Sequence, residues 1–142
     1  MRDVIKVLMI TGNSEILHEM ITFLKEKSQY QNMNFSMPSN ILSFSGLEIH
    51  LCEQTVYLHH KSVPMTYYEF QALCFFAQHP KWVLTKKQIY EAVYHCGIPE
   101  DIDNIVYCLI HNLRNKIEID PRHPEYIHTV RGIGYKFEVK KK

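Results

Sequence analysis

Between residues 41 and 65, apolar and polar side chains alternate with a period of about two, which is typical of strands with one buried face. Polar pairs such as Ser45-Gly46 and Glu53-Gln54 interrupt this alternation at short intervals. The pattern predicts four short strands, over residues 41–44, 47–51, 55–59 and 63–65. Strands this short and this closely spaced favour a small antiparallel meander.

The period changes from two to 3.6 at Thr66, which marks the start of a helix. Thr66 and Glu69 have the spacing of a capping box, in which two side chains cap each other's backbone N–H groups. The pair His79-Pro80 ends this helix, because the residue before a proline disfavours the helical conformation. The predicted buried stripe consists of Phe70, Leu73, Cys74 and Ala77.

A second capping box, formed by Thr85 and Gln88, predicts another helix shortly afterwards. Residues 81–84 between the two helices, Lys-Trp-Val-Leu, are interpreted as a tight turn with an apolar anchor. The inward residues of the second helix are predicted to be Ile89, Ala92 and Val93.

A polar loop over residues 95–101 leads to a third helix, predicted over residues 102–118. After it, two β-type runs over residues 126–130 and 135–139 flank Arg131-Gly132-Ile133-Gly134, where the glycines permit the backbone angles of a hairpin. The predicted inward stripe of the third helix is Ile102, Val106, Leu109, Ile110, Leu113 and Ile117.

The first forty residues have an organisation of their own. An apolar run over residues 4–10 predicts a strand, and an amphipathic pattern over residues 14–27 predicts a helix. A stretch rich in Gln, Asn and Ser follows and is interpreted as a linker. The sequence therefore predicts two parts, residues 1–40 and residues 41–142.

Length and composition fit one globular domain with an appendage: 142 residues, 46% of them hydrophobic and 22% charged. No apolar run approaches the roughly 18 residues of a membrane span, and we expect a cytoplasmic protein without membrane contact. The formal net charge of +1 excludes a uniformly basic surface, so any surface that attracts nucleic acid must be local.

A sheet, three helices and a glycine-turned hairpin, in this order, predict a winged helix-turn-helix, an α+β fold that binds double-stranded DNA. In this fold the third helix, residues 102–118, fits the major groove, and the hairpin wing, residues 126–139, reaches an adjacent minor groove. Helical geometry places hydrogen-bonding side chains opposite the apolar stripe of the third helix. They are Asn104, Tyr107, Cys108, His111 and Asn115, with Asn112 and Arg114 at the margins.

Polar helix faces are also common on plain solvated surfaces, so this face alone does not indicate DNA binding. The charge of the carboxyl end favours DNA. Residues 126–142 carry five basic residues against the single acid Glu138, an excess of four positive charges in a chain whose total is +1. The basic residues are Arg131, Lys136, Lys140, Lys141 and Lys142. Positive charge therefore gathers where a phosphate backbone would lie.

Six segments between residues 41 and 138 together form a longer pattern. They are Gly46-Leu47-Glu48-Ile49; Met65-Thr66 with Glu69-Phe70 and Leu73; His79-Pro80; Val83-Leu84-Thr85 with Gln88-Ile89; Leu113-Arg114 with Lys116-Ile117; and Tyr126-Ile127 with Thr129-Val130-Arg131-Gly132 and Gly134-Tyr135. In these segments the sequence resembles the OmpR/PhoB-type winged-helix effector domain of bacterial response regulators. The last segment resembles the wing signature of that family.

The resemblance implies that Arg131 enters or borders the minor groove and that Arg114 and Lys116 contact or orient on phosphates. Residues 95–101 then correspond to the loop that touches RNA polymerase in some members. His111 stands where members often have an arginine, which removes a permanent charge and weakens or retunes binding. The predicted DNA-binding residues are Thr85, Lys86, Asn104, Tyr107, Cys108, His111, Asn112, Arg114, Asn115, Lys116, Arg131 and Lys136.

Residues 1–40 resemble only the opening strand and helix of a receiver domain. The acidic pair expected after the first receiver strand is replaced by Thr11-Gly12-Asn13, and the phosphoacceptor aspartate has no counterpart. We therefore expect a transcriptional regulator that works independently of phosphorylation. Because one strand and one helix cannot close a sheet, we hypothesise that residues 4–10 pair with a partner strand, either in a homodimer or at the edge of the effector domain's sheet.

Three other interpretations compete with this one. A phosphate-binding turn at residues 11–14 would suggest an enzyme, but one glycine falls short of a nucleotide-binding pattern, so we expect neither catalysis nor a cofactor. His95-Cys96 could suggest zinc, but metal-ligand spacing is absent, and we expect surface histidines and core cysteines instead. The alternative that keeps the fold is a protein-interaction or decoy module with weak DNA affinity.

Overall fold

Four antiparallel strands form the first sheet of the computed structural model, which describes residues 40–139. In sheet order they are β1 (Ile41–Phe44), β2 (Leu47–His50), β3 (Thr55–Leu58) and β4 (Lys61–Ser62). The predicted meander is confirmed, with β2 and β3 each one residue shorter than expected. The strand and helix predicted over residues 4–10 and 14–27 lie outside the described residues.

β4 differs from the strand predicted over residues 63–65. His59 and His60 both have a positive φ, 47° and 66°, and turn the chain so tightly that pairing resumes at Lys61. Pro64 has no N–H group and cannot continue the ladder. The left-handed turn therefore moves the strand two residues towards the amino terminus.

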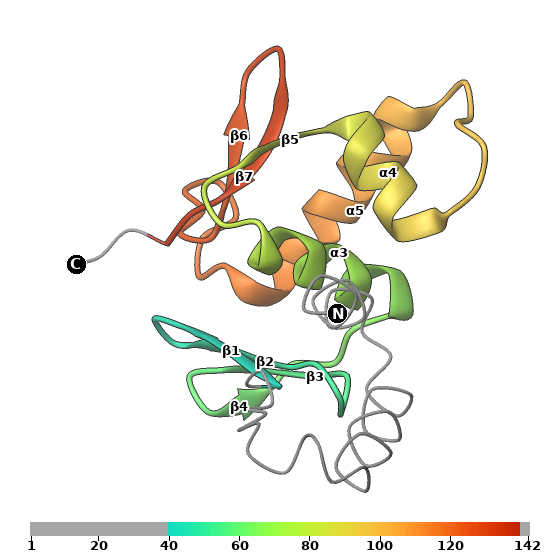
Figure 1. The fold of residues 1–142 in the computed structure, drawn as a ribbon. Coiled ribbons are helices and arrows are strands. Elements are labelled where there is room, and N and C mark those ends of the chain that lie inside the picture. The colour runs from blue at the N-terminus through green and yellow to red at the C-terminus, as the bar shows by residue number, and fades with distance from the viewer. Residues whose placement is uncertain (1–39, 140–142) are drawn as a thin grey trace, which may run out of the picture. The chain divides into compact units, whose positions relative to one another are not determined.

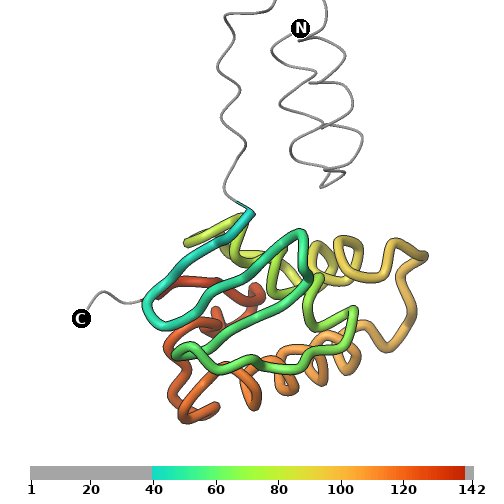
Figure 2. Tube along the Cα trace, turned by 90° about the horizontal axis from the view of Figure 1, so that it is seen from below, coloured from blue at the N-terminus to red at the C-terminus, as the bar shows by residue number. Residues whose placement is uncertain are grey.

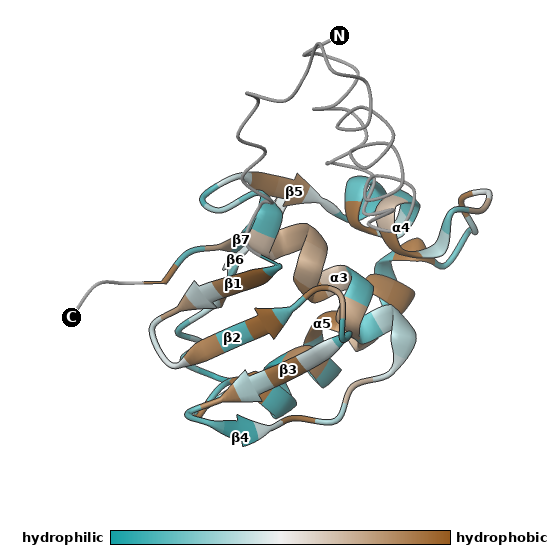
Figure 3. Ribbon diagram, turned by 60° about the horizontal axis from the view of Figure 1, so that its bottom comes forward, coloured by the Kyte–Doolittle hydropathy of each residue, from teal (hydrophilic) through white to brown (hydrophobic). Residues whose placement is uncertain are grey.

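One face of this sheet packs against the helices. Leu47 and Ile49 on β2 and Val56 on β3 are buried, while the residues between them are partly exposed. Figure 3 shows the resulting alternation of apolar and polar residues along the strands. The ring of Phe44 lies 4.8 Å from that of Phe137 near the carboxyl end. Figures 1 and 2 show the sheet on one side of the helices, and Figure 1 shows the carboxyl-terminal hairpin on the other.

Both predicted capping boxes are present. Thr66 caps α3 (Tyr67–Gln78): its hydroxyl accepts from the Glu69 N–H at 3.3 Å, and the Glu69 carboxylate accepts from the Thr66 N–H at 2.9 Å. Thr85 and Gln88 form the same reciprocal pair at the start of α4 (Lys86–Tyr94). The predicted stripe of α3 is buried, and in α4 Ile89 and Val93 are buried with Ala92 at their edge.

The third helix is α5 (Ile102–Ile117), and its predicted apolar stripe faces the core. It ends one residue before the predicted end, because Glu118 is extended and buried. The Glu118 carboxylate accepts the backbone N–H groups of Glu125, Tyr126 and Ile127 at 2.6, 3.0 and 2.9 Å. This side chain therefore ties the end of α5 to the start of the following hairpin. Within residues 40–139, every helix falls short of the length and apolar character that a bilayer span demands.

The interpretation of residues 81–84 as a simple turn is wrong. The turn is at Lys81, whose φ is 69° and whose N–H donates to Phe137 O at 2.8 Å. The chain then extends as β5 (Val83–Thr85), which pairs with β7 in a second sheet of order β5-β7-β6. Three residues are too few to predict a strand, and its partner lies about fifty residues further along the chain.

The predicted hairpin, called the wing below, consists of β6 (Ile127–Val130) and β7 (Gly134–Phe137). Gly132 turns the chain at a φ of 78°, a conformation that L side chains rarely adopt. No side chain fits at Gly134, because a Cβ atom there would lie 2.0 Å from the backbone oxygen of Leu84 on β5. The two glycines therefore shape the tip of the wing and allow β5 to pack against its base.

Candidate nucleic-acid interface

The outer face of α5 carries six exposed polar or weakly polar side chains, called the α5 ridge below. They are Asn104, Tyr107, Cys108, His111, Asn112 and Asn115, all of them predicted from the helical period. The rings of Tyr107 and His111 stack with centroids 6.1 Å apart, and the Tyr107 side chain is 59% exposed. Amide, imidazole and phenol groups can donate and accept hydrogen bonds, so the ridge presents base-reading chemistry without permanent charge.

Arg114 points away from this ridge and binds the wing. Its Nε and Nη2 donate to Ile127 O at 3.1 and 2.8 Å, and Nη2 also donates to Thr129 Oγ1 at 2.8 Å. The guanidinium lies 5.6 Å from the centre of the Tyr135 ring. Burial lowers the pKa of Arg114 from its ordinary value. Arg114 therefore joins α5 to β6 and β7, a role that the sequence pattern did not indicate.

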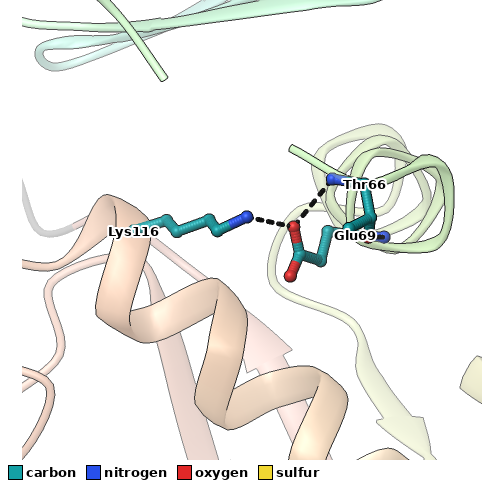
Figure 4. A network of polar contacts seen from close by, with 3 residues as sticks. All are labelled: Thr66, Glu69 and Lys116. Atoms are coloured by element: carbon teal, nitrogen blue, oxygen red, sulfur yellow. Dashed lines mark hydrogen bonds and ion pairs between the residues drawn. The ribbon is translucent and has the colours of Figure 1, made fainter. Parts of the chain in front are cut away.

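Lys116 likewise points into the molecule (Figure 4). Its Nζ donates to Glu69 Oε2 at 2.5 Å, and the same oxygen accepts from the Thr66 N–H at 2.9 Å. Burial by itself would raise the pKa of Glu69, but the hydrogen bonds from Lys116 and Thr66 outweigh it and leave that pKa below its ordinary value. This ion pair joins α5 to the start of α3.

Two more predicted cations have acidic partners. Lys86 Nζ lies 3.0 Å from Asp103 Oδ1, and Lys136 Nζ lies 2.6 Å from Glu138 Oε2. The hydrogen bond from Lys136 lowers the pKa of the Glu138 carboxyl. The hydroxyl of Thr85, also predicted to bind DNA, accepts the N–H of Gln88 as a helix cap.

Several exposed cations make no hydrogen bond through their side chains and no ion pair within residues 40–139, and three of them line the two grooves described below: Arg131, Lys87 and Arg122. Arg131 was predicted from the wing pattern. Lys87 was missed, although it follows Lys86 in the first turn of a predicted helix. Arg122 was missed because its position relative to α5 depends on the fold of the loop after that helix.

A groove separates the wing from the starts of α4 and α5. It has a volume of about 710 Å³ and is lined by Arg131 and Gly132 from the wing tip and by Lys86, Lys87, Ile102 and Asp103 from the two helices. We call it the wing groove. It places the free cation of the wing tip opposite the first turn of α4.

A second groove borders α5 further along the helix, from Tyr107 to Asn115. Its volume is about 400 Å³, and it is lined by Tyr107, His111, Asn115 and Arg122 together with Arg114 and Tyr135. Each of the two grooves therefore has an unpaired cation on its wall. A polyanion bound along α5 and the wing would meet this positive charge.

The cysteines do not follow the expectation of a buried set. Cys74 is buried in α3, but Cys52, Cys96 and Cys108 are exposed. Cys108 belongs to the ridge because its helical position faces away from the apolar stripe. Residues 95–101, the loop between α4 and α5, begin with His95 at a φ of 52° and expose Ile98, whose side chain also borders the wing groove.

Residues 60–137 match the family model described as "Transcriptional regulatory protein, C terminal". The uncharacterized transcriptional regulatory protein YcbL of Bacillus subtilis is 39% identical over 98 residues, which cover 69% of this chain and 43% of the relative. The DNA-binding response regulator MtrA of Mycobacterium tuberculosis is 33% identical over 103 residues, or 72% of this chain and 45% of MtrA. The chain therefore spans less than half the length of these relatives.

Solved structures with this fold include proteins crystallised with DNA. The DNA-binding domain of RstA from Klebsiella pneumoniae, in complex with the RstA box, superposes with a TM-score of 0.64 at 26% identity, covering 69% of this chain and 96% of that domain. DrrB, an OmpR/PhoB homologue from Thermotoga maritima, superposes with a TM-score of 0.66 at 25% identity, covering 86% of this chain and 52% of DrrB.

Proposed function

The chain belongs to the OmpR/PhoB family of transcriptional regulatory proteins, and on that premise we propose that it binds double-stranded DNA with α5 in the major groove and the wing at the minor groove. The observation that carries the proposal is the exposed, uncharged α5 ridge with unpaired Arg131, Lys87 and Arg122 beside it. The superposition on the RstA DNA-binding domain, which was solved in complex with the RstA box, supports DNA as the ligand.

The partners of each cation indicate which of them contact DNA and which hold the fold together. Arg131 at the wing tip, Lys87 at the start of α4 and Arg122 after α5 supply phosphate or minor-groove contacts. Lys86 and Lys136 contribute less, since each already faces a carboxylate. Arg114 and Lys116 act by holding α5, the wing and α3 in one arrangement.

The salt dependence of binding tests this proposal. Each neutralised phosphate contributes a slope of about −0.9 to the plot of log affinity against log salt. Three free cations predict a slope near −2.7, which is about a 40-fold loss of affinity between 50 mM and 200 mM salt. The measurement is fluorescence anisotropy of a labelled random-sequence duplex titrated with the full chain.

Single substitutions sharpen the measurement. Arg131→Ala is expected to weaken binding to every duplex and to reduce the slope by about 0.9. The matched control is Lys61→Ala, because Lys61 is exposed on β4, on the far side of the helices from the wing (Figure 1). A loss of binding equal in both variants would contradict the assignment of Arg131.

A second candidate function is a protein-interaction module with weak DNA affinity. One observation favours it: Lys86, Arg114, Lys116 and Lys136 all have partners inside the protein, so few free positive charges flank the ridge. The anisotropy titration separates the two functions. Salt-insensitive binding, or none, is the outcome expected of the interaction module.

Partners other than DNA are further proposals. We propose that residues 95–101 contact RNA polymerase, supported by the exposed Ile98 in this loop, and that residues 1–40 form a separate dimerisation element. Light scattering of the full chain at tens of micromolar tests the dimer: a monomer would exclude it. Polymerase binding that survives substitution of Ile98 by Asp would exclude this loop.

We also propose that DNA binding does not depend on phosphorylation, because Thr11-Gly12-Asn13 stands where a receiver domain has acidic residues. Incubation with acetyl phosphate should leave the affinity unchanged, and an increase would refute the proposal. The family is a class of regulators and not of enzymes, and the proposed binding of DNA involves no catalysis or cofactor. A DNA-binding role agrees with the cytoplasmic location expected from the sequence.

A further inference from the structure

The α5 ridge lacks the side chains that read guanine most specifically. Guanine is distinguished by two acceptors in the major groove, O6 and N7, which an arginine or lysine contacts together. The basic residues of α5 are Arg114 and Lys116. Arg114 donates three hydrogen bonds to the wing, and Lys116 pairs with Glu69. No guanidinium or ammonium group is left on this helix to face a base.

The side chains that remain suit adenine and thymine. An asparagine amide can bond adenine N6 and N7 together, and apolar atoms pack against the thymine methyl group. Asn104 and Asn115 stand at the two ends of the ridge, and Cys108 lies between them. Next to these three, the Tyr107 ring adds a large apolar surface. His111 can donate to N7, but both purines have that atom, so this contact does not select guanine.

The wing favours the same base pairs for a different reason. Arg131 is exposed at the turn of the hairpin, beside Gly132, and has no partner within residues 40–139. The minor groove of A·T tracts is narrow and strongly negative, and it attracts an inserted arginine. In G·C pairs the guanine amino group projects into this groove. Both reading elements therefore favour A·T pairs.

We propose that the duplex recognised by this chain is rich in A·T pairs, with Asn104 and Asn115 reading adenine and Cys108 and Tyr107 contacting thymine methyl groups. This inference rests on the proposed binding of α5 in the major groove. It names the class of DNA sequence that the ridge selects.

The test is selection of bound duplexes from a random pool by the full chain, followed by competition between one A·T-rich and one G·C-rich duplex. The expected result is enrichment of A·T pairs and at least a tenfold preference for the A·T-rich duplex, as one or two amide–adenine pairs provide. Asn115→Ala should remove enrichment at one position of the selected site. Lys61→Ala, on β4, should leave the selected sequence unchanged.

A gain of function makes the test independent of lost affinity. His111→Arg adds a guanidinium to the ridge and should introduce a selected guanine, whereas His111→Gln, which adds no charge, should not. Conserved guanines in the wild-type sites, or equal affinity for both duplexes, would overturn the inference while leaving DNA binding intact. Absence of binding to any duplex, at low salt as well, would overturn the proposed function and the inference together.

Discussion

Replacing Arg114 with alanine should destabilise the protein as well as weaken DNA binding, because this side chain joins α5 to the wing. Its guanidinium donates to two acceptors, Ile127 O and Thr129 Oγ1. Hydrogen bonds from charged donors contribute about 1.5–3 kcal/mol each, and less where solvent reaches them. Because Arg114 is partly exposed, we take the lower end for each acceptor and subtract for solvent, which gives about 2 kcal/mol in total.

A loss of about 2 kcal/mol lowers the Tm of a domain of this size by about 10 °C. Urea unfolding, followed through the single tryptophan Trp82, measures the free energy directly. Arg114→Lys keeps the charge but not the planar fork, so it should recover little of the lost stability. Arg131→Ala serves as the reference variant: it should leave the free energy of unfolding within about 0.5 kcal/mol of wild type.

The result that would refute this reasoning is a stable Arg114→Ala protein with a reduced salt slope. That outcome would mean that Arg114 contacts phosphate, as the family resemblance implied, and that its bonds to β6 add nothing to folding. If Arg114→Lys restored both affinity and salt slope, it would support the same conclusion, since a phosphate contact needs only the charge.

Three further predictions concern the elements that hold the interface. Gly134→Ala should prevent β5 from pairing with β7, since the new Cβ would meet Leu84 O at 2.0 Å. Gly132→Ala should cost only about 1–2 kcal/mol of folding free energy, because its φ is left-handed. Thermal unfolding ranks the two variants, and equal effects would contradict the close approach of Gly134 to Leu84. Glu118→Ala leaves three backbone N–H groups without their acceptor and should destabilise the protein by about 3 kcal/mol or more, with Glu118→Gln intermediate. Urea unfolding of both variants measures the loss. An alanine variant as stable as wild type would show that water replaces the carboxylate. The pKa of Glu69 is lowered in the folded protein, so its stabilising effect is complete above about pH 5 and disappears as the pH falls through the folded pKa. The difference in unfolding free energy between wild type and Glu69→Gln should therefore shrink in acid. A difference that grew in acid would contradict the lowered pKa.

The helices and the ridge could be predicted from the sequence because their signals are local. The Thr66 and Thr85 capping boxes span four residues each, and they fix where α3 and α4 begin. Once α5 is placed, its period of 3.6 determines which side chains face outward. The exposure of Asn104 and His111 follows from that period alone, without any tertiary contact.

The roles of the cations could not be predicted, because they depend on partners distant in the chain. Lys116 pairs with Glu69, 47 positions away, and Arg114 bonds residues 13 and 15 positions further on. A count of basic residues does not distinguish these paired side chains from cations that are free to bind phosphate. For the same reason β5 was missed, since a three-residue strand is defined by its pairing with β7 and not by its own pattern.

The central claim is that DNA lies across the α5 ridge and against the wing tip, and NMR titration of the isotope-labelled full chain with duplex tests it most directly. The prediction is that amide signals of α5 and of the turn around Gly132 shift or broaden first, while those of β1–β4 stay in place. Larger changes in the β1–β4 sheet, with α5 and the wing unaffected, would contradict it.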